Sequence, residues 1–313
     1  MTARRVAFLF PGQGSQRPGM GRALAEAFAE AREVFEQADR ALGRPLAALC
    51  FEGSPEELAL TENTQPAILA VSIAALRVLE SRGFRPLAAA GHSLGEYSAH
   101  VAAGTLEFAD AVRIVEQRGR FMQEAVPLGQ GAMAAILGMD AESVAEICRQ
   151  AAGDDVVAPA NLNGPAQVVV SGNTAAVDRA MRLAKDAGAR RVVALPVSAP
   201  FHCSLMQPAA ARLRPVLEAI EFRDPRVPVT TNVDARPVEQ GPAARDALLR
   251  QVASPVRWHE SVESLMAGGI DTFIEIGPGK VLSGLVRGLR KGGTVYQVEA
   301  PEQVESVFRE LAA

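Results

Sequence analysis

The chain has 313 residues, 48% of them hydrophobic and 22% charged, which is the composition of a globular protein long enough to bury a large core. The formal net charge of −4 gives no indication of a nucleic-acid-binding protein, so no nucleic-acid partner is expected. No segment approaches the length of a membrane span, and the first apolar run stops at Pro11, too early for a signal peptide, so no membrane partner is expected either.

The first part of the chain predicts strands alternating with helices. Residues 5–10 (RVAFLF) indicate a buried strand, and the loop PGQGSQ follows it. Further elements are expected as helices at about 21–42 and 64–82 with short helical pieces between them, a short strand at 86–91, and helices at about 95–103 and 107–126. This alternation predicts an α/β fold, with a parallel sheet flanked by helices.

The middle of the chain follows a different order. The expected elements are a strand at 132–137, a helix at 140–152, strands at 156–161 and 166–171, a helix at 173–188 and a strand at 190–195. This β-α-β-β-α-β order is typical of a ferredoxin-like unit. We therefore expect an inserted ferredoxin-like subdomain over residues 128–196, of a suitable length for a self-contained unit.

The larger fold is expected to resume after Pro196. Its predicted elements are helices at about 204–219, 242–253 and 257–267, strands at 227–231 and 271–276, a helix to about 290, a strand near 294–298 and a terminal helix. The expected catalytic core thus comprises residues 1–127 and 197–313.

The stretch 91-GHSLG-95 has the G-x-S-x-G pattern of a sharp strand-to-helix turn. Its glycines let the backbone take a strained turn without side-chain clash, and the turn would hold Ser93 beside a helix N-terminus that stabilises negative charge. The short strand before it and the amphipathic segment after it favour a nucleophile over a structural turn residue.

A serine nucleophile needs a base, and the chain has four histidines. His202 lies in a loop after a strand and before a helix, where an α/β sheet presents its site residues. His92, His100 and His259 are expected to pack or to lie at the surface. No acidic residue occupies an obvious strand-end loop between Ser93 and His202, so a carbonyl group or a later residue is left to orient the imidazole.

Two glycine-rich stretches fail as nucleotide-binding motifs. In 12-GQGSQR-17, Arg17 replaces the third glycine of G-x-G-x-x-G. In 277-GPGKVLS-283, Val281 replaces the Ser/Thr of a P-loop, so a tight turn is the preferred interpretation. The scattered Cys50, Cys148 and Cys203 suggest neither a metal site nor disulfides, and we expect a reducing cytoplasm and no cofactor.

Eight stretches, spread over the whole chain, carry a resemblance to a known family. They are FPGQGSQ at 10–16, GHSLGEYSA at 91–99, QRGRFMQEA at 117–125, GAMAAILG at 131–138, ANLNGPAQVVVSG at 160–172, PVSAPFHCSLM at 196–206, QVASPVRW at 251–258 and EIGPGKVLSGL at 275–285. With these motifs in this order the chain resembles malonyl-CoA:acyl carrier protein transacylases. The resemblance implies a hydrolase-like α/β core with a ferredoxin-like insert.

The resemblance also implies the catalytic roles. Ser93 would be the nucleophile that accepts the acyl group, and His202 its base. The backbone N–H groups of Gln13 and Leu94 would form the oxyanion hole.

The substrate-binding residues follow in the same way. Arg118 would pair with the free carboxylate of the malonyl group, and Gln251 would orient the histidine through its carbonyl. Phe201 would fit a pocket of malonyl size.

The implied function is transfer of malonyl from malonyl-CoA to the phosphopantetheine thiol of acyl carrier protein, which feeds fatty acid biosynthesis. An acidic carrier protein would need a basic face, for which the candidates are Arg190, Arg191, Arg287, Arg290 and Lys291. A serine thioesterase, an acyltransferase for another acyl-CoA in a polyketide system and an inert carrier-binding scaffold remain as alternatives. A monomer is expected, because no interface signal is present.

Overall fold

The computed structural model describes residues 4–197, 199–289 and 294–311, and its larger sheet has six strands in the order β10-β9-β1-β2-β7-β8. These strands are β1 (Val6–Phe10), β2 (Ala88–Gly91), β7 (Val229–Thr230), β8 (Pro237–Val238), β9 (Thr272–Ile276) and β10 (Thr294–Val298). The first five in the spatial order pair in parallel, and only β8 runs antiparallel, at the edge beside β7.

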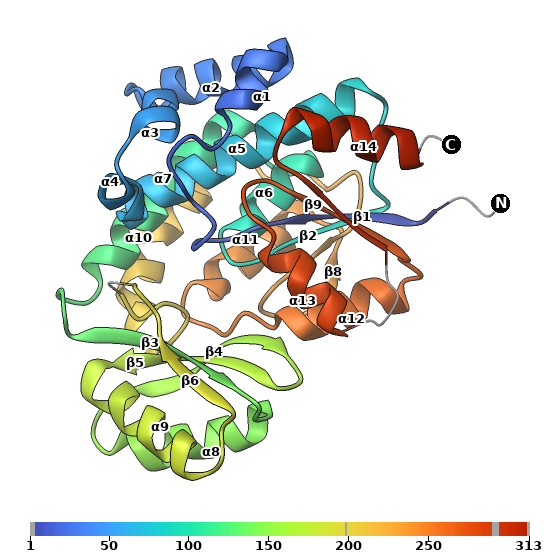
Figure 1. Ribbon diagram of the computed structural model, residues 1–313. Helices are drawn as coiled ribbons and strands as arrows, with labels where there is room; N and C mark the ends of the chain where they lie inside the picture. Colours follow the sequence, from blue (N-terminus) through green and yellow to red (C-terminus); the bar gives the residue numbers. More distant parts are fainter. Residues whose placement is uncertain (1–3, 198, 290–293, 312–313) are drawn as a thin grey trace.

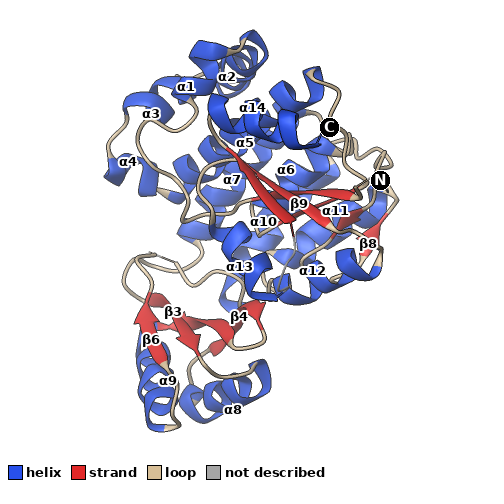
Figure 2. Ribbon diagram, turned by 45° about the vertical axis from the view of Figure 1, so that its right-hand side comes forward, coloured by secondary structure: helices blue, strands red, loops and turns tan. Residues whose placement is uncertain are grey.

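Both faces of this sheet are buried under helices (Figures 1 and 2). Alternating residues of β1 point to opposite faces, since Phe8 and Phe10 belong to one apolar cluster, and Ala7 and Leu9 belong to another. The helices that contribute to the first cluster are α1 (Arg22–Ala27), α2 (Ala29–Leu42), α3 (Leu46–Glu52), α4 (Pro55–Ala59), α5 (Thr61–Ser81), α6 (Gly95–Ala102), α7 (Phe108–Glu124), α10 (Gln207–Glu218), α11 (Gly241–Gln251) and α14 (Pro301–Leu311). The second cluster involves α12 (Trp258–Ala267) and α13 (Val281–Leu289).

A second, four-stranded sheet occupies the green and yellow part of Figure 1. Its strands are β3 (Gly131–Leu137), β4 (Val157–Gly164), β5 (Gln167–Asn173) and β6 (Arg191–Ala194), in the spatial order β4-β5-β3-β6. All its neighbouring strands are antiparallel. Helices α8 (Ala141–Ala152) and α9 (Thr174–Asp186) pack with it around a separate apolar cluster.

The expected fold class is confirmed, including the β-α-β-β-α-β order of the second sheet. The boundaries of the insert at 128 and 196 stay a prediction. The single helix expected over 21–42 is wrong in one detail, because Phe28 is extended and divides it. The ring of Phe28 lies 5.3 Å from the Arg82 guanidinium, so tertiary packing rather than a local breaker residue accompanies this break.

Candidate active site

Ser93 lies in the turn between β2 and α6, with a left-handed backbone conformation (φ 52°). A non-glycine residue held there carries roughly 1–3 kcal/mol of strain, which clusters at functional sites. The flanking glycines are required for close packing: a Cβ on Gly91 would lie 1.9 Å from the Gly95 carbonyl oxygen, and one on Gly95 would lie 2.0 Å from that of Phe10. Gly91 and Gly95 therefore allow backbone segments to pack in direct contact on both sides of the serine.

His202 reaches this serine from the loop that precedes the short 3-10 helix η1 (Ser204–Met206). Its Nε2 lies 2.6 Å from the Ser93 Oγ, and its Nδ1 lies 3.0 Å from the backbone carbonyl oxygen of Gln251. A carbonyl can only accept, so Nδ1 carries the proton and donates it to this bond. Nε2 is then free to accept the proton of the serine hydroxyl.

The charge state of His202 follows from its surroundings. The side chain is buried, and burial, followed by the nearby positive charge of Arg118, lowers the pKa of His202 to about 3. The imidazole is therefore neutral at physiological pH, which is the form that a general base needs.

Arg118, on α7, has a fully buried guanidinium beside the nucleophile. Its Nη1 donates to the Gln65 Oε1 (2.7 Å), and its Nη2 donates to the Gln251 Oε1 (2.9 Å) and the Ser93 Oγ (3.2 Å). Among the described residues its Nε has no acceptor and no carboxylate lies within ion-pair distance. A buried cation held only by neutral groups is suited to binding an anionic ligand.

Two backbone N–H groups lie free near the serine. Within the described part of the chain, neither the N–H of Leu94 nor that of Gln13 has an acceptor. Leu94 precedes the first residue of α6, where N–H groups lack helical partners. A Cβ on Gly12 would lie 2.5 Å from the His92 carbonyl oxygen, so glycine allows the Gln13 loop to approach the serine turn closely.

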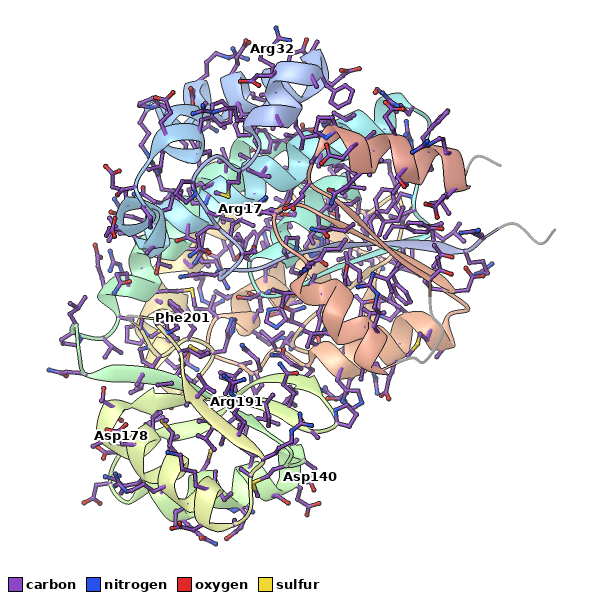
Figure 3. The ribbon with its side chains drawn as sticks, in the orientation of Figure 1. Arg17, Arg32, Asp140, Asp178, Arg191 and Phe201 are labelled. Atoms are coloured by element: carbon purple, nitrogen blue, oxygen red, sulfur yellow. The ribbon has the colours of Figure 1, made fainter. Side chains whose placement is uncertain are left out.

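These groups line one cleft with a volume of about 780 Å³ between the core and the second sheet. Gln13, Ser93 and Arg118 line it from the core, and Met133 and Asn161 line it from the second sheet. Phe201 contributes to its wall, and Figure 3 shows this residue at the junction of the two parts. All six residues expected at the site thus meet in one place, because Leu94 and His202 line the cleft and Gln251 touches His202 and Arg118.

Comparison with known proteins agrees with this arrangement. Residues 7–307 match the family described as acyl transferase domain. The malonyl CoA-acyl carrier protein transacylase of Bacillus subtilis is 50% identical over 308 residues, which cover 98% of this chain and 97% of that protein. The chain belongs to the malonyl-CoA:acyl carrier protein transacylase family.

Solved structures of this transacylase family have the same fold. The malonyl CoA-acyl carrier protein transacylase of Coxiella burnetii superimposes with a TM-score of 0.97 at 43% identity, covering 99% of both chains. A second structure holds a type II PKS acyl-carrier protein in complex with its malonyl-transacylase. This chain matches it with a TM-score of 0.95 at 46% identity, over 98% of this chain and 99% of that one.

Three buried polar residues of this transacylase were missed by the sequence analysis. Asn232 follows β7, and its Oδ1 accepts the Ser93 backbone N–H (2.6 Å) while its Nδ2 donates to the Gly91 carbonyl (2.7 Å). Glu96 and Gln65 contact Gln251 and Arg118 respectively. The position of Asn232, directly after a parallel strand, was a signal that could have identified it. Glu96 and Gln65 lie inside helices, where their spacing resembles that of any polar helix residue.

The remaining histidines behave as expected. The Nε2 of His92 lies 2.9 Å from the Asn163 Oδ1, with its ring against Trp258. His100 is fully buried, and His259 pairs with Glu263 at the surface.

The preferred interpretation of the GPGK stretch is also confirmed, because it forms the turn between β9 and α13. Among the described residues, no group of three or more His, Cys, Asp or Glu side chains could hold a metal ion. In that same part of the chain, no helix has both the length and the apolar surface to cross a membrane.

Proposed function

We propose that this chain transfers a malonyl group from malonyl-CoA to the phosphopantetheine thiol of acyl carrier protein, through a malonyl ester on Ser93. The observation that carries the proposal is the buried Arg118 guanidinium, 3.2 Å from the Ser93 hydroxyl and without a carboxylate partner among the described residues. Arginine binds a carboxylate through two parallel hydrogen bonds and keeps its charge in a buried site.

The first half-reaction forms the ester. His202 accepts the Ser93 proton at Nε2 as the Oγ attacks the thioester carbonyl carbon. The N–H groups of Gln13 and Leu94 hold the oxyanion, each such donor contributing about 3 kcal/mol to lowering the barrier. The carbon–sulfur bond then breaks, His202 returns the proton to the leaving sulfur, and CoA departs as a thiol.

The second half-reaction uses the same groups in the same order. The phosphopantetheine thiol gives its proton to His202 and attacks the ester carbonyl, and the Ser93 oxygen leaves and takes the proton back. The carrier protein departs as the malonyl thioester. Both acyl acceptors carry the same pantetheine arm, so one cleft serves both halves of this ping-pong cycle.

The carrier protein is proposed to bind at the mouth of the cleft, on a basic face. Arg190 and Arg191 are exposed at the start of β6, and this strand leads to Leu195 in the cleft wall. Arg287 is exposed on α13, which begins at the cleft residue Val281. The other two candidates, Arg290 and Lys291, lie outside the described residues. An acidic carrier would be steered to such a face.

We further propose that residues 128–196 form the inserted subdomain, and that the protein acts in the cytoplasm as a monomer. The solved complex of a malonyl-transacylase with a type II PKS acyl-carrier protein makes a polyketide carrier a second candidate acceptor, with unchanged chemistry at Ser93.

A thioesterase would use the same Ser93 and His202. The time course of CoA release distinguishes a thioesterase from a transferase. With malonyl-CoA alone, a transferase should release CoA in one burst equal to the enzyme concentration and then stop. Addition of carrier protein should restart the release. Continuous release without a carrier protein would identify a hydrolase.

A further inference from the structure

Glu96 is a fully buried carboxylate three residues after the nucleophile, and it takes part in neither half-reaction. Its Oε2 accepts from the Gln251 Nε2 (2.7 Å) and from the Asn232 backbone N–H (2.9 Å). Among the described residues no lysine or arginine pairs with it. Burying a carboxylate without an ion pair is costly, so its retention beside the reacting groups indicates a function.

Gln251 connects this carboxylate to the substrate-binding cation. Its amide nitrogen donates to Glu96 and to the Ser93 carbonyl oxygen (3.0 Å), while its amide oxygen accepts from Arg118 (2.9 Å). The reversed amide would place N–H groups against the guanidinium N–H groups and an oxygen against the carboxylate. Only one orientation of the amide therefore satisfies both charged neighbours.

We propose that Glu96 is a positioning residue for malonyl transfer: it fixes the side-chain amide of Gln251, so that the amide oxygen holds Arg118 at the angle required for the malonyl carboxylate. The inference rests on the proposed function and deepens it. Glu96 acts through Gln251 and does not touch the acyl group.

The second carboxylate oxygen is separate from this contact. Glu96 Oε1 has no hydrogen-bond partner among the described residues, and the His100 Nε2 lies 3.9 Å from it. Burial raises the pKa of Glu96 to about 7. The charges of Arg118 and Asp234 also act on this carboxyl group, the first lowering its pKa and the second raising it. A proton on this carboxyl group would sit on Oε1, because both donors occupy Oε2, so the role depends on a well-placed acceptor oxygen rather than on negative charge.

Two conservative variants separate the effect of the length of the Glu96 side chain from the effect of its charge. Glu96→Gln removes the charge but keeps an acceptor oxygen at the same reach. Glu96→Asp keeps the charge but withdraws the oxygen by one methylene. Ser98→Ala is the matched control, since Ser98 is a buried residue of the same helix whose hydroxyl has no partner among the described residues.

The readout is rapid-quench acylation with malonyl-CoA and with acetyl-CoA, in which burst amplitude counts folded sites and the rate constant reports positioning. We expect Glu96→Asp to lower the malonyl rate, and the preference for malonyl over acetyl, by about tenfold at full amplitude. Glu96→Gln should stay within about threefold of the parent, and Ser98→Ala should match it.

The inference is overturned if Glu96→Asp keeps the parent rate and preference, or if Glu96→Gln loses both at full amplitude. If Glu96→Asp gives no burst, the variant has no folded sites to compare, and the inference is then overturned only if Glu96→Gln loses both the malonyl rate and the malonyl preference at full amplitude. Failure of the proposed function itself would look different, because the parent protein would then form no malonyl adduct at Ser93.

Discussion

The Nη2 of Arg118 lies 3.2 Å from the Oγ of Ser93, so the group that binds the carboxylate directly adjoins the nucleophile. In a malonyl thioester a single methylene separates the carboxylate from the carbonyl carbon that is attacked. A short distance between cation and nucleophile is therefore what a malonyl group requires, whereas longer diacids would need a larger separation. The buried cation thus selects for both the charge and the length of the acyl group.

Arg118 should determine the preference for malonyl. Arg118→Ala removes the partner of the buried malonyl carboxylate. We expect kcat/KM for malonyl-CoA to fall about a hundredfold, which corresponds to a loss of about 3 kcal/mol of transition-state stabilisation. Acetyl-CoA has no carboxylate, so its acylation should be affected far less. Arg118→Lys keeps the charge but loses the planar guanidinium, so its kcat/KM for malonyl-CoA should lie between those of the parent and Arg118→Ala. An equal loss for both thioesters would contradict this role.

The pH dependence of acylation should reflect the buried base. Because burial and Arg118 lower the pKa of His202 to about 3, the imidazole stays neutral until the solution is strongly acidic. Lowering the pH protonates the base and reduces activity, so the acid limb should lie far below the ordinary histidine value. Single-turnover acylation should be nearly constant from about pH 8 to about pH 5. An acid limb near the ordinary histidine pKa of 6.5 would show that His202 is not held in this environment.

Gly95 should tolerate no side chain although it lies in a helix. A Cβ there would meet the Phe10 carbonyl oxygen at 2.0 Å, so Gly95→Ala must push β1 away from the serine turn. Loss of acylation and a lower Tm are expected. Gly284 in α13 is the matched control, since a Cβ there meets nothing within 4 Å. Gly284→Ala should raise stability by about 1 kcal/mol, the usual helical preference for alanine. Similar Tm changes in the two variants would contradict the packing argument.

The basic face should affect only the carrier protein. Reversing Arg191 and Arg287 to glutamate should raise the KM for carrier protein and leave that for malonyl-CoA unchanged, with a weaker salt dependence of association. Arg32→Glu is a suitable control, because Figure 3 shows Arg32 at the top of the core, away from the second sheet on which Arg191 lies. An unchanged carrier KM in the double variant would remove this surface from the account.

Much of the fold could be predicted from periodicity and turn residues. The buried strand before PGQGSQ, the serine turn and the β-α-β-β-α-β order all have local signals, and each lies close to its expected place. Strand β7 also falls inside the strand predicted at 227–231. The two-residue strand β8 is too short to produce such a signal, and only its pairing with β7 defines it. The break at Phe28 depends on packing between distant segments, which no local pattern encodes.

The residues of the site likewise differ in whether a local sequence signal predicts them. Ser93 and His202 were found from motif and loop position, since a strained turn and a strand-end loop have recognisable sequences. Arg118 looks like any solvated helix arginine and was assigned only through the family resemblance. Asn232 accepts the Ser93 N–H across 139 residues of chain, and it donates its own N–H to Glu96 across 136 residues. Such contacts exist only after folding, so sequence spacing alone could not reveal them.

Intact-protein mass spectrometry can show whether Ser93 carries a malonyl ester and whether Arg118 selects it. The protein and its Ser93→Ala variant would be mixed with malonyl-CoA or acetyl-CoA in the absence of carrier protein. We expect a stable malonyl adduct and a weak acetyl adduct on the parent protein, and no adduct on Ser93→Ala. An equal malonyl adduct on Ser93→Ala, or CoA release by the parent without any adduct, would rule out a stable malonyl ester on Ser93.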